Sequence, residues 1–282
     1  MQNVRVMRIR GILVLVAALA LTGGVLSGTG VEAAPVWAPA ATAPIHPGVQ
    51  TFTNNAQCTA NFVFYIGTTV YIGQAAHCSG TDGNTAVDGC TSGSLPLGTL
   101  VDVTGASQPG TMVYNSWLTM QATGESDPDT CAYNDLALVQ LSPADAANVN
   151  PSVPHWGGPV GVNRTGSPTL SLVYSYGNSE LRGGVTLLSP KTGLSLGDAS
   201  GWEHEVSTIT PGIPGDSGSA FLDANGNALG VLSFLETFPI PLSNGVGDIG
   251  REVIYAQNHG FGGLLLAAGT QPFNPNQLPL GP

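Results

Sequence analysis

The feature that most restricts the fold is the alternation of short apolar runs with glycine- and proline-rich turns. The chain of 282 residues holds 39 Gly and 21 Pro, which leaves little room for long helices. The apolar runs are rich in β-branched and aromatic side chains, as strands are. The clearest runs cover residues 59–66, 69–72, 136–141, 169–176 and 228–234. This pattern predicts an all-β fold.

The first thirty-odd residues have the layout of an export signal. Three arginines precede an apolar run over residues 12–26, and small side chains follow up to Ala33. These features predict a signal peptide over residues 1–33, and therefore a secreted protein. A membrane anchor is the alternative, but the two glycines at 23–24 and the shortness of the run disfavour it.

Changes in composition divide the rest of the chain. Residues 34–55 are rich in Ala, Pro and Thr, which predicts an extended mature terminus or a short pro-segment. Proline and glycine gather again between residues 145 and 165, where we place a boundary between two lobes. The expected division is an N-terminal lobe over 56–150, a C-terminal lobe over 151–270 and a tail over 271–282.

Two local patterns predict further elements. A helix is expected over residues 250–259, with Asp248 as its N-cap and Gly260 as its stop. A strand is expected over residues 114–121.

The charge balance excludes some partners. Loss of residues 1–33 removes three arginines and Glu32, leaving four basic and seventeen acidic side chains, a formal charge near 4 − 17 = −13. Such a protein repels phosphate backbones and anionic lipid, so neither nucleic acid nor a membrane is expected as a partner after signal cleavage.

Four cysteines in an exported chain indicate two disulfides, with three possible connectivities. Zinc is the competing interpretation, but no Cys-x-x-Cys pair supports it. A separate acidic cluster could suit calcium, although a solvated acidic loop is favoured. That cluster consists of Glu125, Asp127 and Asp129.

The stretch over residues 214–220 carries the strongest hint of chemistry. Ser217 stands between two glycines and follows Asp216. A tight turn of this kind can direct backbone N–H groups beside the serine hydroxyl, where they would bind an oxyanion. The alternative is an ordinary turn of polar and small residues.

Two other segments precede this one, a histidine segment first and an aspartate segment after it. His77 lies in Ala-Ala-His-Cys, and Asp135 begins an apolar run before the serine segment. Together the three segments, within residues 58–260, resemble the chymotrypsin-like (trypsin-fold) serine peptidase family. An α/β-hydrolase is disfavoured, because its elbow reads G-x-S-x-G and the fifth position here is Ser219.

The resemblance implies a fold and a set of catalytic roles. The fold is two six-stranded antiparallel β-barrels with a short C-terminal helix. Ser217 is implied as nucleophile, His77 as general base and Asp135 as the group that orients His77. The N–H groups of Gly215 and Ser217 are implied as the oxyanion hole.

The resemblance also implies a substrate pocket, formed by Pro211, Ser233, Phe234 and Leu235. Pro211 stands where trypsin-like members carry an aspartate, so a preference for Lys or Arg is not expected. Leu235 stands where a glycine often keeps the pocket open. This favours a small or modest apolar side chain at P1, the residue whose carbonyl is attacked.

Two structural consequences follow from the same resemblance. It implies a Cys58–Cys78 disulfide and with it Cys90–Cys131. In much of the family a new amino terminus, released after a basic residue, pairs with the aspartate before the nucleophile. Residues 11–163 contain no Lys or Arg, so Asp216 needs another partner, for which Arg164 and Arg182 are the candidates.

The sequence therefore predicts a secreted, monomeric serine endopeptidase that acts on protein or peptide substrates without a cofactor or metal ion. Two alternatives stay open. One is a catalytically silent relative that serves as an extracellular binding module, which the absent activation site and the changed pocket residues favour. The other is an esterase with the same nucleophile.

Overall fold

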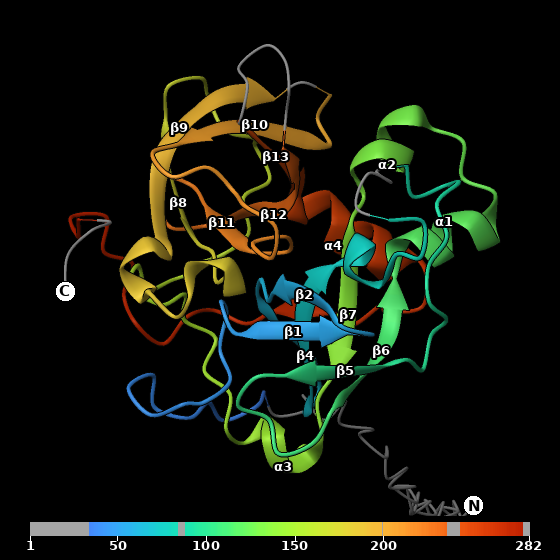
Figure 1. Ribbon diagram of the computed structural model, residues 1–282, viewed down its shortest axis with the longest axis horizontal. Coiled ribbons are helices and arrows are strands. Elements are labelled where there is room, and N and C mark those ends of the chain that lie inside the picture. Colours follow the sequence, from blue (N-terminus) through green and yellow to red (C-terminus); the bar gives the residue numbers. More distant parts are fainter. Residues whose placement is uncertain (1–33, 84–87, 199, 236–242, 279–282) are drawn as a thin grey trace, which may run out of the picture. The chain divides into compact units, whose positions relative to one another are not determined.

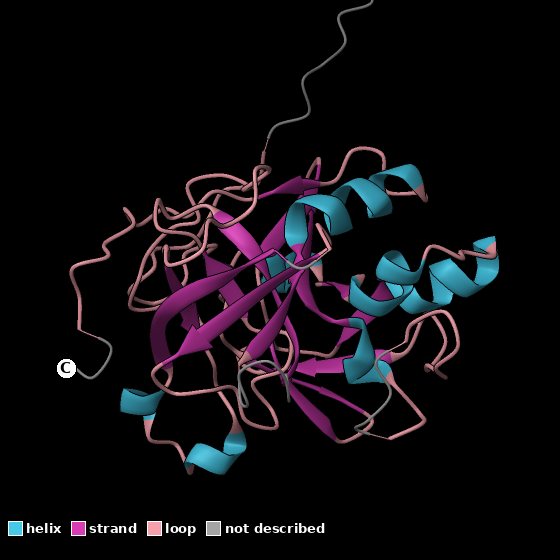
Figure 2. Ribbon diagram, turned by 90° about the horizontal axis from the view of Figure 1, so that it is seen from above, coloured by secondary structure: helices cyan, strands magenta, loops and turns pink. Residues whose placement is uncertain are grey.

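The computed structural model describes residues 34–83, 88–198, 200–235 and 243–278. The predicted signal peptide at residues 1–33 lies outside these ranges. In the described part strands make up the interior and the helices lie around them (Figure 2). None of the helices described is long and apolar enough to cross a bilayer.

Seven strands from the first half of the chain and β14 from near its end form an eight-stranded sheet, here called the N-terminal sheet, in the order β14-β3-β4-β7-β6-β5-β1-β2 (Figure 1). Its strands are β1 (Gln50–Thr53), β2 (Ala56–Thr59), β3 (Val63–Ile66), β4 (Thr69–Ala75), β5 (Leu100–Val103), β6 (Gly110–Asn115), β7 (Leu136–Gln140) and β14 (Leu265–Leu266). The hairpin from β1 to β2 turns at Asn54 and Asn55, both with positive φ, as its tight turn requires.

The second half closes into a six-stranded barrel, the C-terminal barrel, in the order β10-β13-β12-β11-β8-β9. Its strands are β8 (Leu172–Tyr176), β9 (Pro190–Asp198), β10 (Glu203–Thr208), β11 (Ala220–Leu222), β12 (Ala228–Leu235) and β13 (Asn244–Asp248). All the pairings are antiparallel.

The prediction of two six-stranded barrels therefore holds for the C-terminal barrel and not for the N-terminal sheet. The sheet includes β14, which follows the barrel strands in the sequence and pairs antiparallel with β3 (Leu265 opposite Tyr65). The pairing joins residues 200 positions apart, a distance over which no local sequence pattern operates.

The helices are short. They are α1 (Ser116–Thr123), α2 (Pro128–Tyr133), α3 (Pro143–Ala146) and α4 (Ile249–Asn258), with 3₁₀ turns η1 (Ala76–Ser79), η2 (Glu180–Arg182) and η3 (Thr186–Leu188). The helix predicted at 250–259 is confirmed as α4, because the Asp248 carboxylate accepts the N–H of Arg251 at 2.8 Å and caps it.

The strand predicted over residues 114–121 is wrong. β6 ends at Asn115, whose side-chain oxygen accepts the N–H groups of Trp117 at 2.9 Å and Leu118 at 3.3 Å. An asparagine at this position satisfies the unpaired donors of a helix start, so the chain turns into α1.

One apolar cluster joins the sheet to the barrel. Phe62 and Leu138 of the sheet side, Tyr174 and Val231 of the barrel and Val253 of α4 are all buried in it. Burial of this kind stabilises a fold by about 25 cal/mol per Å² of apolar surface. The seam between sheet and barrel is therefore part of the core, and residues placed along it are held rigidly.

A charged trio centred on the buried His204 ties the barrel to α4. The imidazole of His204 on β10 contacts Asp198 through Nδ1 at 2.5 Å and Asp248 through Nε2 at 3.0 Å. Burial disfavours the charged imidazole, but hydrogen bonds and charge attraction from both carboxylates outweigh it and raise the pKa of His204 to about 9.

This trio predicts a loss of stability in alkali. The folded pKa of about 9 lies above the unfolded value of 6.5, so the contribution is complete below pH 6.5 and disappears as the pH rises through 9. The expected loss is roughly 3 kcal/mol of unfolding free energy, measured by denaturant titration from pH 6 to 10. His204→Gln should flatten this alkaline limb, whereas His46→Gln should leave it in place; an unchanged limb in His204→Gln would contradict the assignment.

Candidate active site

His77 and Asp135 face each other at one end of two interior strands of the N-terminal sheet. β4 leads into η1, which carries His77, and Asp135 directly precedes β7, the strand paired with β4. The Asp135 carboxylate accepts the His77 N–H at 2.9 Å through Oδ1 and contacts Nδ1 of the ring at 2.7 Å through Oδ2. Because Nδ1 is occupied, Nε2 is the ring nitrogen left for a proton transfer.

The same contacts set the proton affinity of the imidazole. Burial alone would lower the pKa of His77, but the charge of Asp135 and the hydrogen bond to it raise the pKa above its ordinary value of 6.5. The pair is thus arranged to stabilise an imidazolium.

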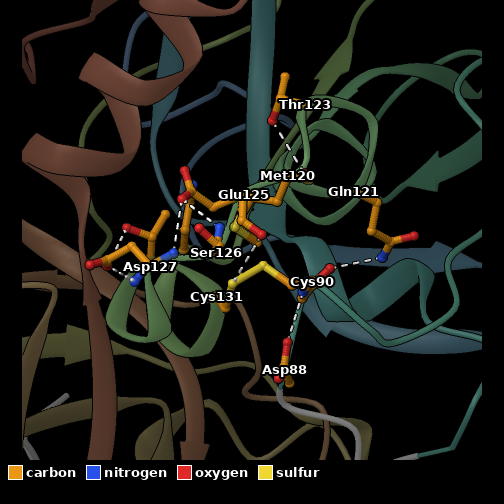
Figure 3. Close-up of a disulfide and its surroundings, with 12 residues drawn as sticks. Asp88, Cys90, Met120, Gln121, Thr123, Glu125, Ser126, Asp127 and Cys131 are labelled. Carbon is orange, nitrogen blue, oxygen red and sulfur yellow. Dashed lines mark hydrogen bonds between the residues drawn. A yellow bond between two sulfur atoms is a disulfide. The ribbon is translucent and has the colours of Figure 1, made fainter.

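Both disulfides brace this region. Cys58–Cys78 ties β2 to η1 beside His77, and Cys90–Cys131 ties a loop to α2, ahead of Asp135. Figure 3 shows the second bridge, beside which the backbone N–H of Cys90 donates to the Asp88 carboxylate at 2.9 Å. No free cysteine remains in the described chain, so the thiolates that a zinc site would need are not available.

The acidic cluster that suggested calcium has a local role. Glu125 Oε1 accepts the N–H groups of Ser126 at 2.8 Å and Asp127 at 3.0 Å, and Asp127 caps α2 through the N–H of Thr130 at 2.8 Å (Figure 3). Both carboxylates therefore accept backbone N–H groups at or just before the start of α2, where the helix itself provides no acceptor.

Sequence reasoning missed Glu252, which lies behind Asp135. Its Oε1 accepts the backbone N–H of Asp135 at 2.8 Å from α4, and its side chain is fully buried. Burial raises the pKa of Glu252 well above its ordinary value, and the charges of Asp135 and Asp248 add to the rise. An acidic residue on the buried face of an amphipathic helix was the available signal, since such residues are seldom buried without a partner.

Most backbone N–H and C=O groups of the segment from Ile213 to Ser217, here called the nucleophile loop, form hydrogen bonds. Carbonyls at 213, 214, 215, 216 and 217 each accept a hydrogen bond, and the N–H groups of 213 and 216 each donate one. Of the four N–H groups in this loop, those of Gly215 and Ser217 have no acceptor among the described residues. Buried or half-buried N–H groups are rarely left unpaired, so this pair of donors is a marked feature.

The partner of Asp216 is Arg182, one of the two candidates, together with Lys191, which sequence reasoning missed. Arg182 binds both carboxylate oxygens, at 2.8 and 2.5 Å, and Lys191 Nζ lies 3.2 Å from Oδ2. Asp216 and Lys191 are fully buried. Burial lowers the pKa of Lys191, and the Asp216 charge opposes that shift. Two internal cations therefore neutralise the Asp216 carboxylate.

The three motif residues line one cleft of about 830 Å³ between sheet and barrel. His77, Asp135 and Ser217 border it, together with Ser233, Phe234 and Leu235 of the expected pocket. Pro211 is not among its lining residues; its carbonyl instead accepts a hydrogen bond from Lys191 at 3.0 Å. The described residues show no hydrogen bond between the Ser217 hydroxyl and His77, a contact that often tightens only with substrate bound.

The cleft walls are mainly apolar. Phe234 stacks on Tyr133 with ring centroids 5.9 Å apart. Gly212, Leu232 and Leu235 lie together on the cleft wall: a Cβ on Gly212 would come within 2.9 Å of Asn244 Oδ1, 3.0 Å of a Leu232 methyl carbon and 3.4 Å of a Leu235 methyl carbon. Such walls bind uncharged side chains best.

Comparison with known proteins places the fold. No protein-family model and no curated protein matches the sequence. Among solved structures, Thermobifida fusca protease A is similar at 18% identity and a TM-score of 0.52, covering 80% of this chain and 99% of that one. Cellulomonas bogoriensis chymotrypsin is similar at 17% identity and a TM-score of 0.48, covering 79% of this chain and 98% of that one. The chain has the fold of the chymotrypsin-like serine peptidases.

Proposed function

We propose that the protein is a secreted serine endopeptidase. In this mechanism Ser217 attacks a peptide carbonyl, His77 takes the hydroxyl proton through Nε2 and passes it to the leaving amine, and Asp135 holds His77 in the required tautomer. An acyl-enzyme forms at Ser217, and water then releases it.

The observation that carries the proposal is the pair of unpaired N–H donors in the nucleophile loop. Gly215 and Ser217 leave their N–H groups free beside the serine, while their neighbours are all bonded. Fixed donors next to a nucleophile are what an oxyanion needs in the transition state. The contact between His77 Nδ1 and Asp135 at 2.7 Å supports the assignment of His77 as the general base.

The apolar cleft supports a substrate with a small or modest apolar P1 side chain. Leu232 and Leu235 lie on the cleft wall beside Gly212 and present apolar side chains to it. The two disulfides support export to an oxidising compartment.

Labelling with a fluorophosphonate probe tests the proposal. We expect one label per chain, mapped to Ser217 by peptide mass spectrometry, and cleavage of a peptide library after small apolar residues. A chain that takes up no label would be the silent binding module instead. Turnover of esters without any turnover of peptides would identify an esterase.

The His77–Asp135 pair predicts the pH dependence of turnover. The base must be neutral, so kcat/KM should fall on acidification, with an inflection above pH 6.5 because the pKa of His77 is raised. Asp135→Asn should lower that inflection and reduce kcat by about 10⁴-fold. Asp129→Asn, which changes a half-buried acid on α2, is the control and should leave both unchanged; an unmoved inflection in Asp135→Asn would contradict the pairing.

A further inference from the structure

A second layer of side chains holds the nucleophile loop from outside. The segment from Gly177 to Arg182, which follows β8 and contains η2, lies against the loop and carries the arginine that binds Asp216. Within it Ser179 is buried and donates its hydroxyl to the carbonyl of Pro214 at 2.5 Å. The same hydroxyl accepts the N–H of Leu181 at 3.1 Å, so its orientation is set from both sides.

This hydrogen bond determines where the Gly215 N–H points. The carbonyl of Pro214 and the N–H of Gly215 belong to one peptide unit, and that unit is trans, since the cis bond in the described chain is Gly158–Pro159. In a planar trans peptide the C=O and N–H point in opposite directions. Ser179 therefore fixes the Gly215 N–H by holding the carbonyl on the other side.

Two side chains of β2 hold the next peptide unit. The Gly215 carbonyl accepts Gln57 Nε2 at 3.0 Å and Thr59 Oγ1 at 2.7 Å. Gln57 also accepts the N–H of Glu180 at 3.0 Å through Oε1, which links it to the segment that carries Ser179. Gly215 has φ of +93°, where a glycine backbone rotates easily, so without these contacts the loop would be free to turn the donor away.

We infer that Ser179 and Gln57 are positioning residues that keep the Gly215 N–H aimed into the cleft as an oxyanion donor. The inference rests on the proposed function and adds to it the requirement that these two side chains orient the oxyanion donor. Neither residue touches the reacting atoms; each acts through a backbone carbonyl of the nucleophile loop.

Substitution by residues that pack but do not donate tests the inference. We expect Ser179→Ala and Gln57→Met each to lower kcat by about ten- to a hundredfold with KM within about twofold, because only the transition state carries the oxyanion. The inhibition constant of a peptidyl trifluoromethyl ketone, whose adduct with Ser217 carries an oxyanion, should rise by the same factor as kcat/KM falls.

Matched controls are available on neighbouring elements. Ser175→Ala changes another buried serine, on β8, and Gln50→Met removes a donor to the Asn178 carbonyl that Gln57 also contacts at 3.3 Å. Both controls should keep the wild-type kcat and inhibition constant. Thermal unfolding of every variant is measured in parallel, and Gln57→Met decides the question if Ser179→Ala does not fold.

The outcomes distinguish a failure of this inference from a failure of the proposed function. Wild-type labelling and turnover with kcat unchanged in Ser179→Ala and Gln57→Met would overturn the inference alone. A rise in KM with kcat unchanged would overturn it as well. Failure of the wild-type protein to label or turn over any substrate would overturn the proposed function and the inference with it.

Discussion

Replacement of Ser217 by alanine is expected to abolish fluorophosphonate labelling and to lower peptide turnover by about 10⁶-fold without loss of folding. The substitution removes one oxygen from a residue on the cleft and leaves the backbone intact, including the bond from Thr59 to the Ser217 carbonyl and the bond from the adjacent Gly218 to the Leu232 carbonyl. Loss of a triad nucleophile has effects of this size, because the base and the orienting acid then have no hydroxyl to activate.

The matched control is Ser219→Ala, two residues along. The Ser219 hydroxyl is buried and has no hydrogen-bond partner among the described residues, so its loss should leave labelling and turnover at wild-type levels. Peptide cleavage that persists in Ser217→Ala, in protein free of contaminating peptidase, would refute the assignment of the nucleophile.

Asp216→Asn is expected to destabilise the protein by about 3–5 kcal/mol and to reduce turnover strongly. The change leaves Arg182 and Lys191 without the carboxylate between them, and uncompensated buried charge is costly. It also weakens the acceptor for the N–H groups of Ile213 and Ser179, which hold the nucleophile loop in place.

Urea unfolding monitored by circular dichroism measures the free energy, and peptide hydrolysis measures the turnover. Asp102→Asn, on the exposed side of β5, is the control and should change neither. A loss below about 1 kcal/mol in Asp216→Asn, as for a surface ion pair, would show that the buried cluster does not hold the loop.

Local chemistry explains where sequence interpretation succeeded. α4 was predictable because Asp248 is an N-cap at its first turn and Gly260 has φ of +102° just beyond its end. α1 was not, because its apolar side chains suit a strand equally well and only the capping contacts of Asn115 turn the chain into a helix.

The candidate site shows the same division. The order of the histidine, aspartate and serine segments was enough to propose His77, Asp135 and Ser217, all of which lie on one cleft. Glu252, Lys191 and Ser179 were missed, because each acts through a partner more than 18 residues away in sequence. Pro211 was placed in the pocket by position alone, but its carbonyl is engaged by Lys191.

The sequence by itself determined the β-rich class of the fold, its short elements and the three segments that carry the candidate chemistry, since these depend on contacts between near neighbours. Only the tertiary structure decided that β14 joins the N-terminal sheet, that Arg182 and Lys191 neutralise Asp216, and that Ser179 and Gln57 hold the loop beside Ser217. These pairings join distant parts of the chain through burial and charge, and such contacts exist only once the core has brought the two halves together.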